Sequence, residues 1–387
     1  MSPDLEPILK YALSFMHILF IPTWFETPDR PSAGKAVKDL AYALALEGIK
    51  VNILFQSGAH FPLITKLNHQ VEVWHSHSAW PGKLFPIWNL TSLWSYHRVF
   101  KQYIRVHGKP DLIHIHSYPL LSLAHFIFRK YRIRTVYTEH SSKVAQKKLN
   151  LPERLLIKQY TGNAVRVVCV SEYLKIGLKN SLPGTDIEVI PNTVDFKSFL
   201  PGTKSSTPQL IMINLLNKNK QVDLGIQVFA LWVKQHPEAQ LHIIGDGPEK
   251  SSLEQLVTDL DLKNKVIWWG EKNAEEWLPQ LRSSTALLLM SRSETFGVVV
   301  VEALACGVPV VSLQNGGIEE LRMNSRIPIL PADAYAEQIT DALDKVLDKF
   351  DQDYAMQIRN ELKFRFDYPA VAKEYINLYH DHLNSTL

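Results

Sequence analysis

Short apolar runs alternate along the chain with longer segments whose apolar residues recur at helical spacing. In the first half, such runs predict buried strands at residues 17–21, 51–55, 111–116, 134–138, 167–170 and 188–190. Residues 34–48 and 120–132 predict helices, and the apolar face of the first comprises Val37, Leu40, Ala41, Leu44 and Ala45. Apolar strands separated by helices are typical of a parallel, doubly wound sheet.

The second half repeats this alternation after residues 201–208, which have the composition of a linker. Beyond the linker, strands are predicted at residues 209–215, 240–244, 266–269, 286–290 and 308–313. Helices are predicted at residues 223–235, 250–260 and 274–281, around Glu302, and at residues 366–383. The pattern therefore predicts two α/β domains of similar architecture.

The composition, with 46% hydrophobic and 21% charged residues among 387, is typical of a soluble globular protein with core enough for two domains. No apolar run approaches the roughly 18 residues that span a bilayer. Residues 1–15 have neither a basic leader nor a small-residue cleavage site, so we expect no secretory signal, and Met16 is an alternative start. Cys169 and Cys306 each lie in an apolar run, which predicts reduced core residues of a cytoplasmic protein.

The net charge of +3 conceals an uneven distribution between the two halves. Residues 1–190 contain 23 Lys and Arg against 13 Asp and Glu, a balance of +10, whereas the remainder contains 19 against 26, a balance of −7. A basic half indicates an anionic partner, such as lipid headgroups or a phosphorylated carrier. No recognition motif accompanies this charge, so we expect no nucleic-acid partner.

The most informative segment is residues 291–311, in which two carboxylates, Glu294 and Glu302, flank a glycine, Gly297. We interpret Glu294 as the end of a loop, Gly297 as the start of a helix and Glu302 as a residue within it. A helix N-terminus offers free N–H groups and a partial positive charge, which suit a phosphate. The two carboxylates can accept hydrogen bonds from sugar hydroxyls, so the segment predicts a nucleotide-sugar site.

This Glu-x7-Glu segment resembles the signature of the retaining glycosyltransferases of family 4, which have the GT-B fold. Three further segments resemble motifs of that family in the same order along the chain. They are Pro191-Asn-Thr-Val-Asp195, Ile244-Gly-Asp-Gly-Pro-Glu249 and Asn315-Gly-Gly-Ile-Glu-Glu320, the last with Glu319 where proline is usual. The resemblance covers the chain from about Met16 to its C-terminus.

The resemblance implies the GT-B fold: two Rossmann-like domains with doubly wound parallel sheets, a ligand cleft between them and a C-terminal crossover helix. We expect an N-terminal extension (1–15), an N-terminal acceptor domain (16–190) and a linker (191–208). A C-terminal nucleotide-sugar domain (209–363) and a helix that packs back on the N-terminal domain (364–387) complete the expected plan.

The resemblance also assigns roles to residues of the second domain. Lys220 and the backbone of Thr295, Phe296 and Gly297 are expected to hold the donor diphosphate. Glu302 is expected to bind the ribose, and Glu294 the hydroxyls of the donor sugar near the reacting face. We name Glu294, Lys220 and His140 as candidate catalytic residues.

The sequence departs from the family at one phosphate-binding position. Leu215 stands where many members have arginine, and Asn214 where they have glycine. One of the usual two phosphate cations is therefore missing, and Lys218 or Asn217 is a candidate substitute in donor binding.

The first domain contributes three further candidates by the same resemblance. Gly34 is expected to let the first loop approach the donor, although a ligand-free helix start explains it equally well. His116, at a strand end, is expected to line the cleft, and His140 to contact the donor sugar or the acceptor. His114 and His116 lie on one face of a strand, yet no ligand set supports a metal site, and we expect no metal or cofactor.

Residues 74–94 contain four of the nine tryptophans, with Lys83 before and Arg98, Lys101 and Arg105 after the last of them. Exposed aromatic residues beside cations suit a membrane interface or a lipid-linked acceptor, whereas a loop packed on the domain core is the alternative. We therefore expect a cytoplasmic protein that binds peripherally to an anionic inner membrane face.

The leading hypothesis is a metal-independent, retaining hexosyltransferase that moves a sugar from a nucleoside-diphosphate sugar to a glycan or lipid-linked acceptor. A sugar-nucleotide epimerase shares the fold, and the linker motif together with Glu-x7-Glu favours transfer. A non-catalytic nucleotide-sugar-binding protein stays open because of Leu215. The sequence indicates neither the donor sugar nor the base, the acceptor or the linkage.

Overall fold

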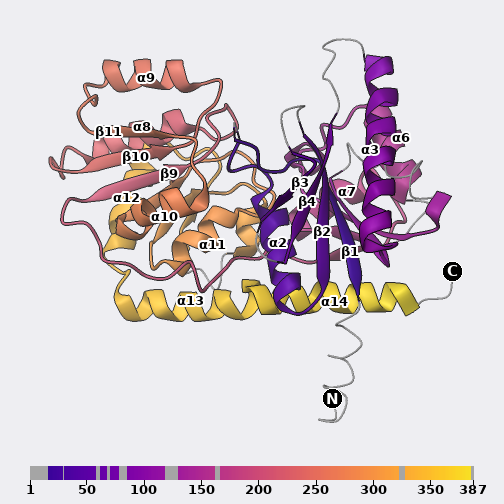
Figure 1. Cartoon of the computed structure of the whole chain (residues 1–387). Coiled ribbons are helices and arrows are strands. Elements are labelled where there is room, and N and C mark those ends of the chain that lie inside the picture. Colours follow the sequence, from indigo (N-terminus) through magenta and orange to yellow (C-terminus); the bar gives the residue numbers. More distant parts are fainter. Residues whose placement is uncertain are drawn as a thin grey trace. The chain divides into compact units, whose positions relative to one another are not determined.

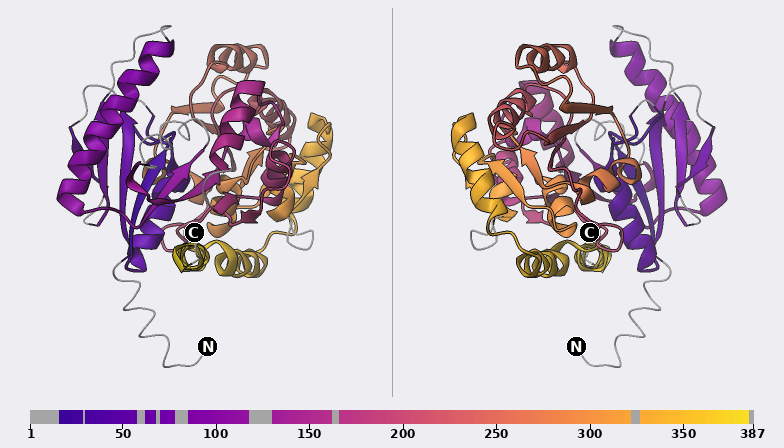
Figure 2. Two further views of the ribbon diagram at one scale, coloured as in Figure 1. Left: turned by 90° about the vertical axis from the view of Figure 1, so that its right-hand side faces the viewer. Right: turned by 90° about the vertical axis from the view of Figure 1, so that its left-hand side faces the viewer.

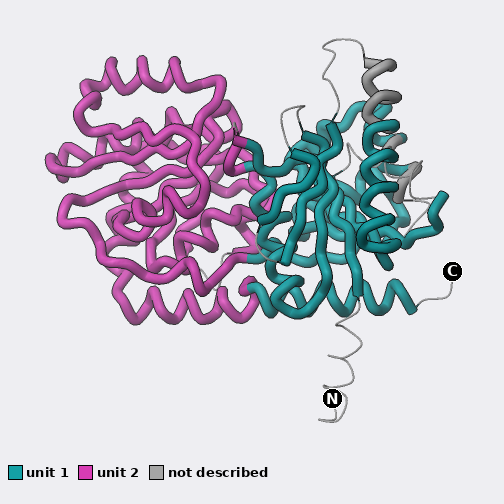
Figure 3. The backbone as a smooth tube through the Cα atoms, in the orientation of Figure 1, with its two compact units in different colours: residues 1–27, 33–193, 368–387 teal, residues 28–32, 194–367 magenta. Residues whose placement is uncertain are grey.

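The computed structural model describes residues 16–28, 30–57, 62–67, 70–77, 85–117, 130–161, 166–321 and 327–384. The chain divides into two compact units (Figures 1 and 3). Unit 1 comprises residues 1–27, 33–193 and 368–387, and unit 2 comprises residues 28–32 and 194–367. Each unit has its own sheet and its own hydrophobic core.

Unit 1 is built on a sheet whose described strands run in the order β3-β4-β2-β1-β5-β6-β7-β8. The strands are β1 (His17–Pro22), β2 (Lys50–Ser57), β3 (Ile64–Lys66), β4 (Glu72–His77), β5 (Leu112–His116), β6 (Arg134–Glu139), β7 (Arg166–Cys169) and β8 (Ile187–Val189). All neighbours pair in parallel except β3 with β4. Every residue of β1 and β5 is buried, which explains why these strands are continuous apolar runs in the sequence.

Helices lie on both faces of this sheet (Figures 1 and 2). They are α2 (Lys35–Leu46), α3 (Phe85–His107), α5 (Ser142–Ala145), α6 (Leu151–Thr161), α7 (Glu172–Lys179) and α14 (Tyr368–Asn384). The predicted face of α2 is confirmed, because all five of its named apolar residues are buried. The predicted helix at 120–132 lies largely outside the described residues.

β3, β4 and α3 were not predicted from the sequence, and Trp74 corrects the expectation of exposed aromatic residues over 74–94. Trp74 is only 1% exposed, because its side chain points from β4 toward α3 and packs edge-on against Tyr103 and His107. Trp94 on α3, by contrast, is 65% exposed. The side chains of Trp80 and Trp88 lie outside the described residues.

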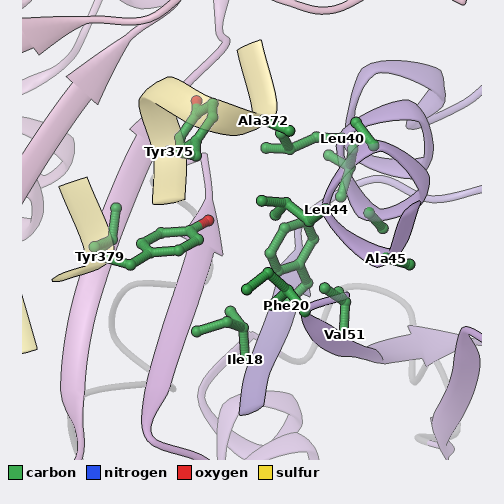
Figure 4. Close-up of a cluster of buried hydrophobic side chains, with 14 of the residues drawn as sticks. Ile18, Phe20, Leu40, Leu44, Ala45, Val51, Ala372, Tyr375 and Tyr379 are labelled. Atoms are coloured by element: carbon green, nitrogen blue, oxygen red, sulfur yellow. The ribbon is translucent and has the colours of Figure 1, made fainter. Parts of the chain in front are cut away.

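The core of unit 1 joins the sheet to α2 and α14 (Figure 4). Ile18 and Phe20 of β1 and Leu40 and Leu44 of α2 pack in one buried cluster with residues of α14, including Ala372, Tyr375 and Tyr379. Tyr368 at the start of α14 donates a hydrogen bond to Asp39 of α2 (3.1 Å). The last helix of the chain is thus an integral part of the core of the first unit.

Unit 2 is built on a sheet whose described strands are all parallel, in the order β11-β10-β9-β12-β13-β14. The strands are β9 (Gln209–Ile213), β10 (Gln240–Ile244), β11 (Val266–Gly270), β12 (Ala286–Leu289), β13 (Val310–Leu313) and β14 (Ile329–Leu330). The helices are α8 (Val222–Trp232), α9 (Lys250–Asp259), α10 (Ala274–Ser283), α11 (Val298–Ala305), α12 (Ala336–Leu347), α13 (Gln352–Phe366) and the short 3₁₀ helix η2 (Gly317–Leu321). The predicted strands and helices of this half are confirmed within a few residues, whereas β14, α12 and α13 were not predicted.

The motif at residues 191–195 has a structural role in unit 2. Asp195 accepts hydrogen bonds from the backbone of Lys197 (2.9 Å) and from the hydroxyl of Ser198 (2.5 Å). Arg359 of α13 is buried and donates to the carbonyl oxygens of Phe196, Phe199 and Ala305, the last residue of α11. The linker, α13 and the end of α11 are therefore fixed to one another.

Candidate functional site: the carboxyl edge of the second sheet

The turn into α11 places an array of free donors at the carboxyl end of β12. Gly297 directly precedes the helix with φ 83°, a left-handed conformation that is costly for residues with a Cβ. Its predicted position at the helix start is confirmed. No described residue accepts a hydrogen bond from the N–H of Thr295, Phe296 or Gly297. These donors lie at the positive end of the helix dipole, where an anion is stabilised.

The loop after β13 holds this turn in place through its backbone. Glu294 donates its N–H to the carbonyl of Asn315 and accepts from the N–H of Gly317, both at 3.0 Å. A Cβ on Gly317 would lie 2.5 Å from the carbonyl group of Thr295. The glycine therefore permits a close approach between the two loops that no other residue would allow. Two of the motifs in the sequence meet here by direct backbone contact.

The two candidate catalytic residues of unit 2 form an ion pair. Lys220 Nζ lies 2.5 Å from Glu294 Oε1, and the two side chains are 22% and 12% exposed. The loop that carries Lys220 is shaped by Asn217, whose Oδ1 accepts from the N–H groups of Asn219 (3.0 Å) and Lys220 (3.2 Å). The structure thus places the oxygen of Asn217 in the loop backbone, while Lys218 is exposed. In this arrangement, the Lys220 ammonium is already paired with a carboxylate.

Glu302 lies within α11, as predicted, and is 2% exposed. Glu302 does not lie on the helix surface, because the apolar residues on either side of it are packed in the core. A buried carboxylate is stable only where hydrogen bonds or charges compensate for lost hydration. The burial of Glu302 one turn into α11 therefore indicates a carboxylate that accepts hydrogen bonds.

Three polar residues that the sequence analysis did not assign to the site mark the same edge of the sheet. Asn214 follows β9, Ser291 follows β12 and Asn315 follows β13. The Nδ2 of Asn214, the Oγ of Ser291 and both amide atoms of Asn315 are buried, and none has a hydrogen-bond partner among the described residues. Buried polar atoms are nearly always paired, so this edge is built for a polar ligand or for ordered water. Polar residues within two positions of the ends of apolar strands were the signal in the sequence.

A cavity of about 160 Å³ opens beside the carboxyl ends of β9 and β10. Its lining includes Asn214, Leu215, Gly245, Asp246, Lys272 and Trp277. The motif at 244–249 shapes it, because a Cβ on Gly245 would overlap the carbonyl oxygen of Asn214. Leu215 is 56% exposed, so this position presents apolar surface rather than a cation.

Unit 1 carries the predicted histidines at the carboxyl ends of β5 and β6. His116 Nδ1 lies 3.2 Å from His140 Nε2, and the two rings are stacked with centroids 5.4 Å apart. His114, two positions earlier on the same face of β5, is hydrogen-bonded to Tyr379 of α14 and to Thr138, both at 2.7 Å. His114 therefore belongs to the core, whereas His116 and His140 form a pair at the strand ends.

Burial keeps these imidazoles neutral. Desolvation lowers the pKa of His140 to about 4 and the pKa of His114 and His116 well below the ordinary value. Glu139 has the opposite shift: desolvation raises its pKa to about 7, although it accepts hydrogen bonds from Tyr137 and from the backbone of His140 and Ser141. A carboxyl group that titrates near neutrality thus lies directly beside His140.

Gly34 is explained by its own surroundings. It precedes α2 with φ 71°, and a Cβ there would lie 2.5 Å from the carbonyl oxygen of Trp24. Glycine is thus needed for packing, whether or not a ligand approaches the loop. Over the described residues, no group of three potential metal ligands occurs. Nor does any helix in those residues combine the length and apolar character that crossing a membrane requires.

Comparison with known families adds to this geometry. The model of the family Glycosyl transferases group 1 matches residues 195–363, and the model of Glycosyltransferase Family 4 matches residues 33–198. The two matches follow one another and cover most of the chain. The chain belongs to glycosyltransferase family 4. It is therefore a glycosyltransferase that uses a nucleotide sugar.

Two curated relatives show the range of the family. The chain is 26% identical to N-acetyl-alpha-D-glucosaminyl L-malate synthase of Bacillus anthracis over 288 residues, which are 70% of this chain and 74% of that protein. It is 27% identical to the phosphatidylinositol N-acetylglucosaminyltransferase gpi3 subunit of Schizosaccharomyces pombe over 253 residues, which are 63% of this chain. That match spans 54% of the yeast protein, so the chain corresponds to about half of its length.

Solved structures share the GT-B fold with this family 4 member. Sucrose-phosphate synthase from Thermosynechococcus elongatus superposes with a TM-score of 0.79 at 18% identity, covering 94% of this chain and 98% of that one. Anabaena HepE in complex with UDP-glucose superposes with a TM-score of 0.72 at 17% identity, covering 95% and 100%. At these identities the likeness concerns the fold.

Proposed function

We propose that this family 4 enzyme is a retaining hexosyltransferase whose donor diphosphate binds at the N-terminus of α11, with Lys220 and Glu294 at the reacting end. The observation that carries the proposal is the Lys220–Glu294 ion pair beside three free backbone donors. A phosphate at this point would receive the N–H groups and the ammonium together, and fixed donors of this kind stabilise a departing diphosphate.

The other parts of a nucleotide sugar fit neighbouring features of unit 2. Glu302, buried one turn into α11, is proposed to accept hydrogen bonds from the ribose. The cavity beside β9 and β10 suits a nucleobase, because Leu215 and Trp277 give it an apolar wall and Asn214 a polar one. Asn315 and Ser291, with their buried unpaired atoms, would bind phosphate or sugar oxygens.

The transfer step itself needs little from the protein beyond positioning. The bond from the anomeric carbon to the diphosphate breaks, and the acceptor hydroxyl oxygen bonds to the same face of that carbon. The acceptor proton passes to the departing phosphate oxygen. Glu294 would orient the sugar hydroxyls, and Lys220 would neutralise charge on the leaving group. His140 is proposed to contact the donor sugar or the acceptor, and its neutral imidazole can donate and accept there.

A glycan or lipid-linked acceptor is proposed from the basic charge of the first 190 residues. The relatives named above add amino sugars to malate and to phosphatidylinositol, to judge from their names, so the family itself admits soluble and lipid acceptors. HepE has been solved with UDP-glucose, which makes UDP the first nucleotide to test. A cytoplasmic enzyme at the inner membrane face agrees with the same charge.

The deciding experiment has two stages. Thermal shifts with UDP, GDP and ADP identify the nucleotide, and release of that diphosphate from its sugar is then followed with a mixture of acceptors. We expect release in the wild type and a rate of release about 100-fold or more lower in Glu294→Gln, with diphosphate binding retained. Glu319→Gln, a substitution of an exposed glutamate of η2, is the matched control.

Two other outcomes would contradict the proposal. Diphosphate binding without release under any acceptor would point to the exposed Leu215, where a phosphate cation is usual, as the cause. Conversion of the donor to an epimer, with no acceptor present, would indicate isomerisation instead of transfer.

A further inference from the structure

The outer face of α3 carries a stripe of cations that the transfer chemistry does not use. Trp94, Arg98, Lys101 and Arg105 are all exposed. Because successive residues of an α-helix turn by about 100°, these four positions fall within an arc of about 60°. The opposite face, with Tyr96, Val99, Phe100 and Tyr103, is buried. The helix is therefore amphipathic, with the usual polar face replaced by a basic one.

No carboxylate offsets this stripe. α3 contains no Asp or Glu in its 23 residues. Between Glu72 and Glu139 the sequence contains nine Lys and Arg but a single acid, Asp111. Asp111 accepts a hydrogen bond from the backbone of His17 (2.8 Å). Among the described residues none forms an ion pair with Arg98, Lys101 or Arg105, although ion pairs occur elsewhere in unit 1.

The stripe is hollowed in a way that suits a phosphate headgroup. A surface depression of about 390 Å³ is lined by Trp94, His97, Arg98, Lys101, Gln102 and Arg105. The guanidinium of Arg98 lies 5.6 Å from the ring of Trp94, a cation–π contact that leaves the indole at the end of the stripe. Three cations around one depression form a binding surface for phosphate oxygens.

Exposed apolar side chains favour a bilayer over a nucleic acid as the partner. Trp94 is 65% exposed, and tryptophan beside cations is typical of a membrane interface. The sequence contains no Asp, Glu, Lys or Arg from residue 84 to residue 97, immediately before Arg98. On α6 of the same unit, Leu151 and Leu155 lie one turn apart at 69% and 58% exposure, with Arg154 exposed beside them. Exposed aliphatic side chains can insert into the lipid of a bilayer, whereas the phosphate backbone of a nucleic acid offers them no apolar surface to contact.

We propose that the basic face of α3, centred on Arg98, Lys101 and Arg105, docks the protein on the surface of an anionic phospholipid bilayer. The charges supply attraction to the headgroups, and Trp94 inserts at the interface. The inference does not depend on the proposed transfer reaction, because it rests on the charge and exposure of unit 1 alone.

Vesicle sedimentation of the full chain tests the proposal. Vesicles of phosphatidylcholine alone are compared with vesicles that also contain phosphatidylglycerol, at low and high salt. Wild type is expected to sediment only with the anionic vesicles, and salt should weaken binding. Each cation near the surface is worth about fivefold in partition, so the variant Arg98→Gln/Lys101→Gln/Arg105→Gln should bind on the order of 100-fold more weakly.

A triple variant with the same loss of charge elsewhere is the control: Lys234→Gln/Lys263→Gln/Lys349→Gln, three exposed lysines of unit 2. It should keep vesicle binding, and both triple variants should keep the wild-type melting temperature and diphosphate affinity. Equal vesicle binding by the two triple variants would overturn the proposal. So would a wild type that ignores anionic vesicles but binds RNA through the same three residues.

Discussion

The Lys220–Glu294 ion pair yields the sharpest test of the donor site, because the two residues should affect diphosphate binding in opposite ways. Their charged atoms lie 2.5 Å apart, and both side chains are mostly buried. If the diphosphate binds beside Lys220, it must take over the ammonium from Glu294. Removing the lysine then costs a contact, whereas removing the charge of the glutamate removes a competitor.

The size of each effect follows from this exchange. A hydrogen bond between an ammonium and a phosphate is worth about 1.5–3 kcal/mol, so Lys220→Met should raise the Kd for the diphosphate by about 10- to 150-fold. Glu294→Gln leaves the ammonium available, so the same Kd should stay unchanged or fall by up to about tenfold. Turnover of the nucleotide sugar should fall in both variants. Lys220→Met lacks the cation that neutralises the leaving group, and Glu294→Gln lacks the charge that holds the sugar hydroxyls.

Isothermal titration with whichever of UDP, GDP and ADP binds the wild type gives both numbers without an acceptor. Lys263→Met, an exposed lysine elsewhere in unit 2, controls for loss of a positive charge and should change the Kd by less than about threefold. A Lys220→Met variant that binds the diphosphate as well as wild type would refute the site. A Glu294→Gln variant that loses as much affinity as Lys220→Met would refute the competition and leave the pair a structural one.

Three further predictions concern the scaffold. Gly317→Ala should lower the free energy of unfolding by about 2 kcal/mol or more and weaken diphosphate binding, because its Cβ would meet the backbone of Thr295. Gly48→Ala is the control, since Gly48 has φ 88° but no atom within 4 Å of the added Cβ. It should cost only about 1 kcal/mol in urea unfolding and leave diphosphate binding intact. Arg359→Met should lower the free energy of unfolding by about 3 kcal/mol, since three carbonyl groups lose a charged donor, and a change below 1 kcal/mol would contradict that role. The pKa of His140 is lowered from 6.5 to about 4 in the fold, so its neutral form contributes stability that is present above pH 6.5 and lost as the pH falls toward 4. The free energy of unfolding of His140→Gln should therefore depend less on pH than that of wild type over that interval, with a difference of no more than about 3 kcal/mol. Parallel curves of unfolding free energy against pH would contradict the lowered pKa.

The sequence predicted the second unit well because its signals are local. Each strand there is a short apolar run, and each helix follows within a few residues. Gly297 and Glu302 could be placed because a glycine directly before an apolar run allows the chain to turn into a helix there. The ion pair of Lys220 with Glu294 could not be predicted, since the two residues are 74 positions apart. Neither could the exposed state of Leu215, which depends on the turn after β10.

The first unit was predicted less completely for the opposite reason. Residues 72–107 carry aromatic and basic side chains in no simple alternation, so neither β4 nor α3 was recognised. Trp74 and Trp94 have the same chemistry and lie within one segment of sequence, yet one is 1% and the other 65% exposed. Their difference in exposure depends on the packing of α3 on β4, which no periodicity within the segment predicts.

Non-local packing also explains why the sequence identified the histidines of unit 1 as candidates but could not tell the core histidine, His114, from the pair at the strand ends. His114 is hydrogen-bonded to Tyr379, which lies 265 positions away on α14, and Thr138 is hydrogen-bonded both to His114 and to Tyr375. His114 also lies against His116, with ring centroids 4.1 Å apart, and His116 is hydrogen-bonded to His140. The helix at the end of the chain is therefore connected to the predicted catalytic histidine through His114 and His116. A polar network in the interior holds its members in a single arrangement only when all are satisfied. It follows that substitutions on the buried face of α14 should alter the pH dependence of His140 as well as the stability of unit 1, although α14 carries none of the family motifs.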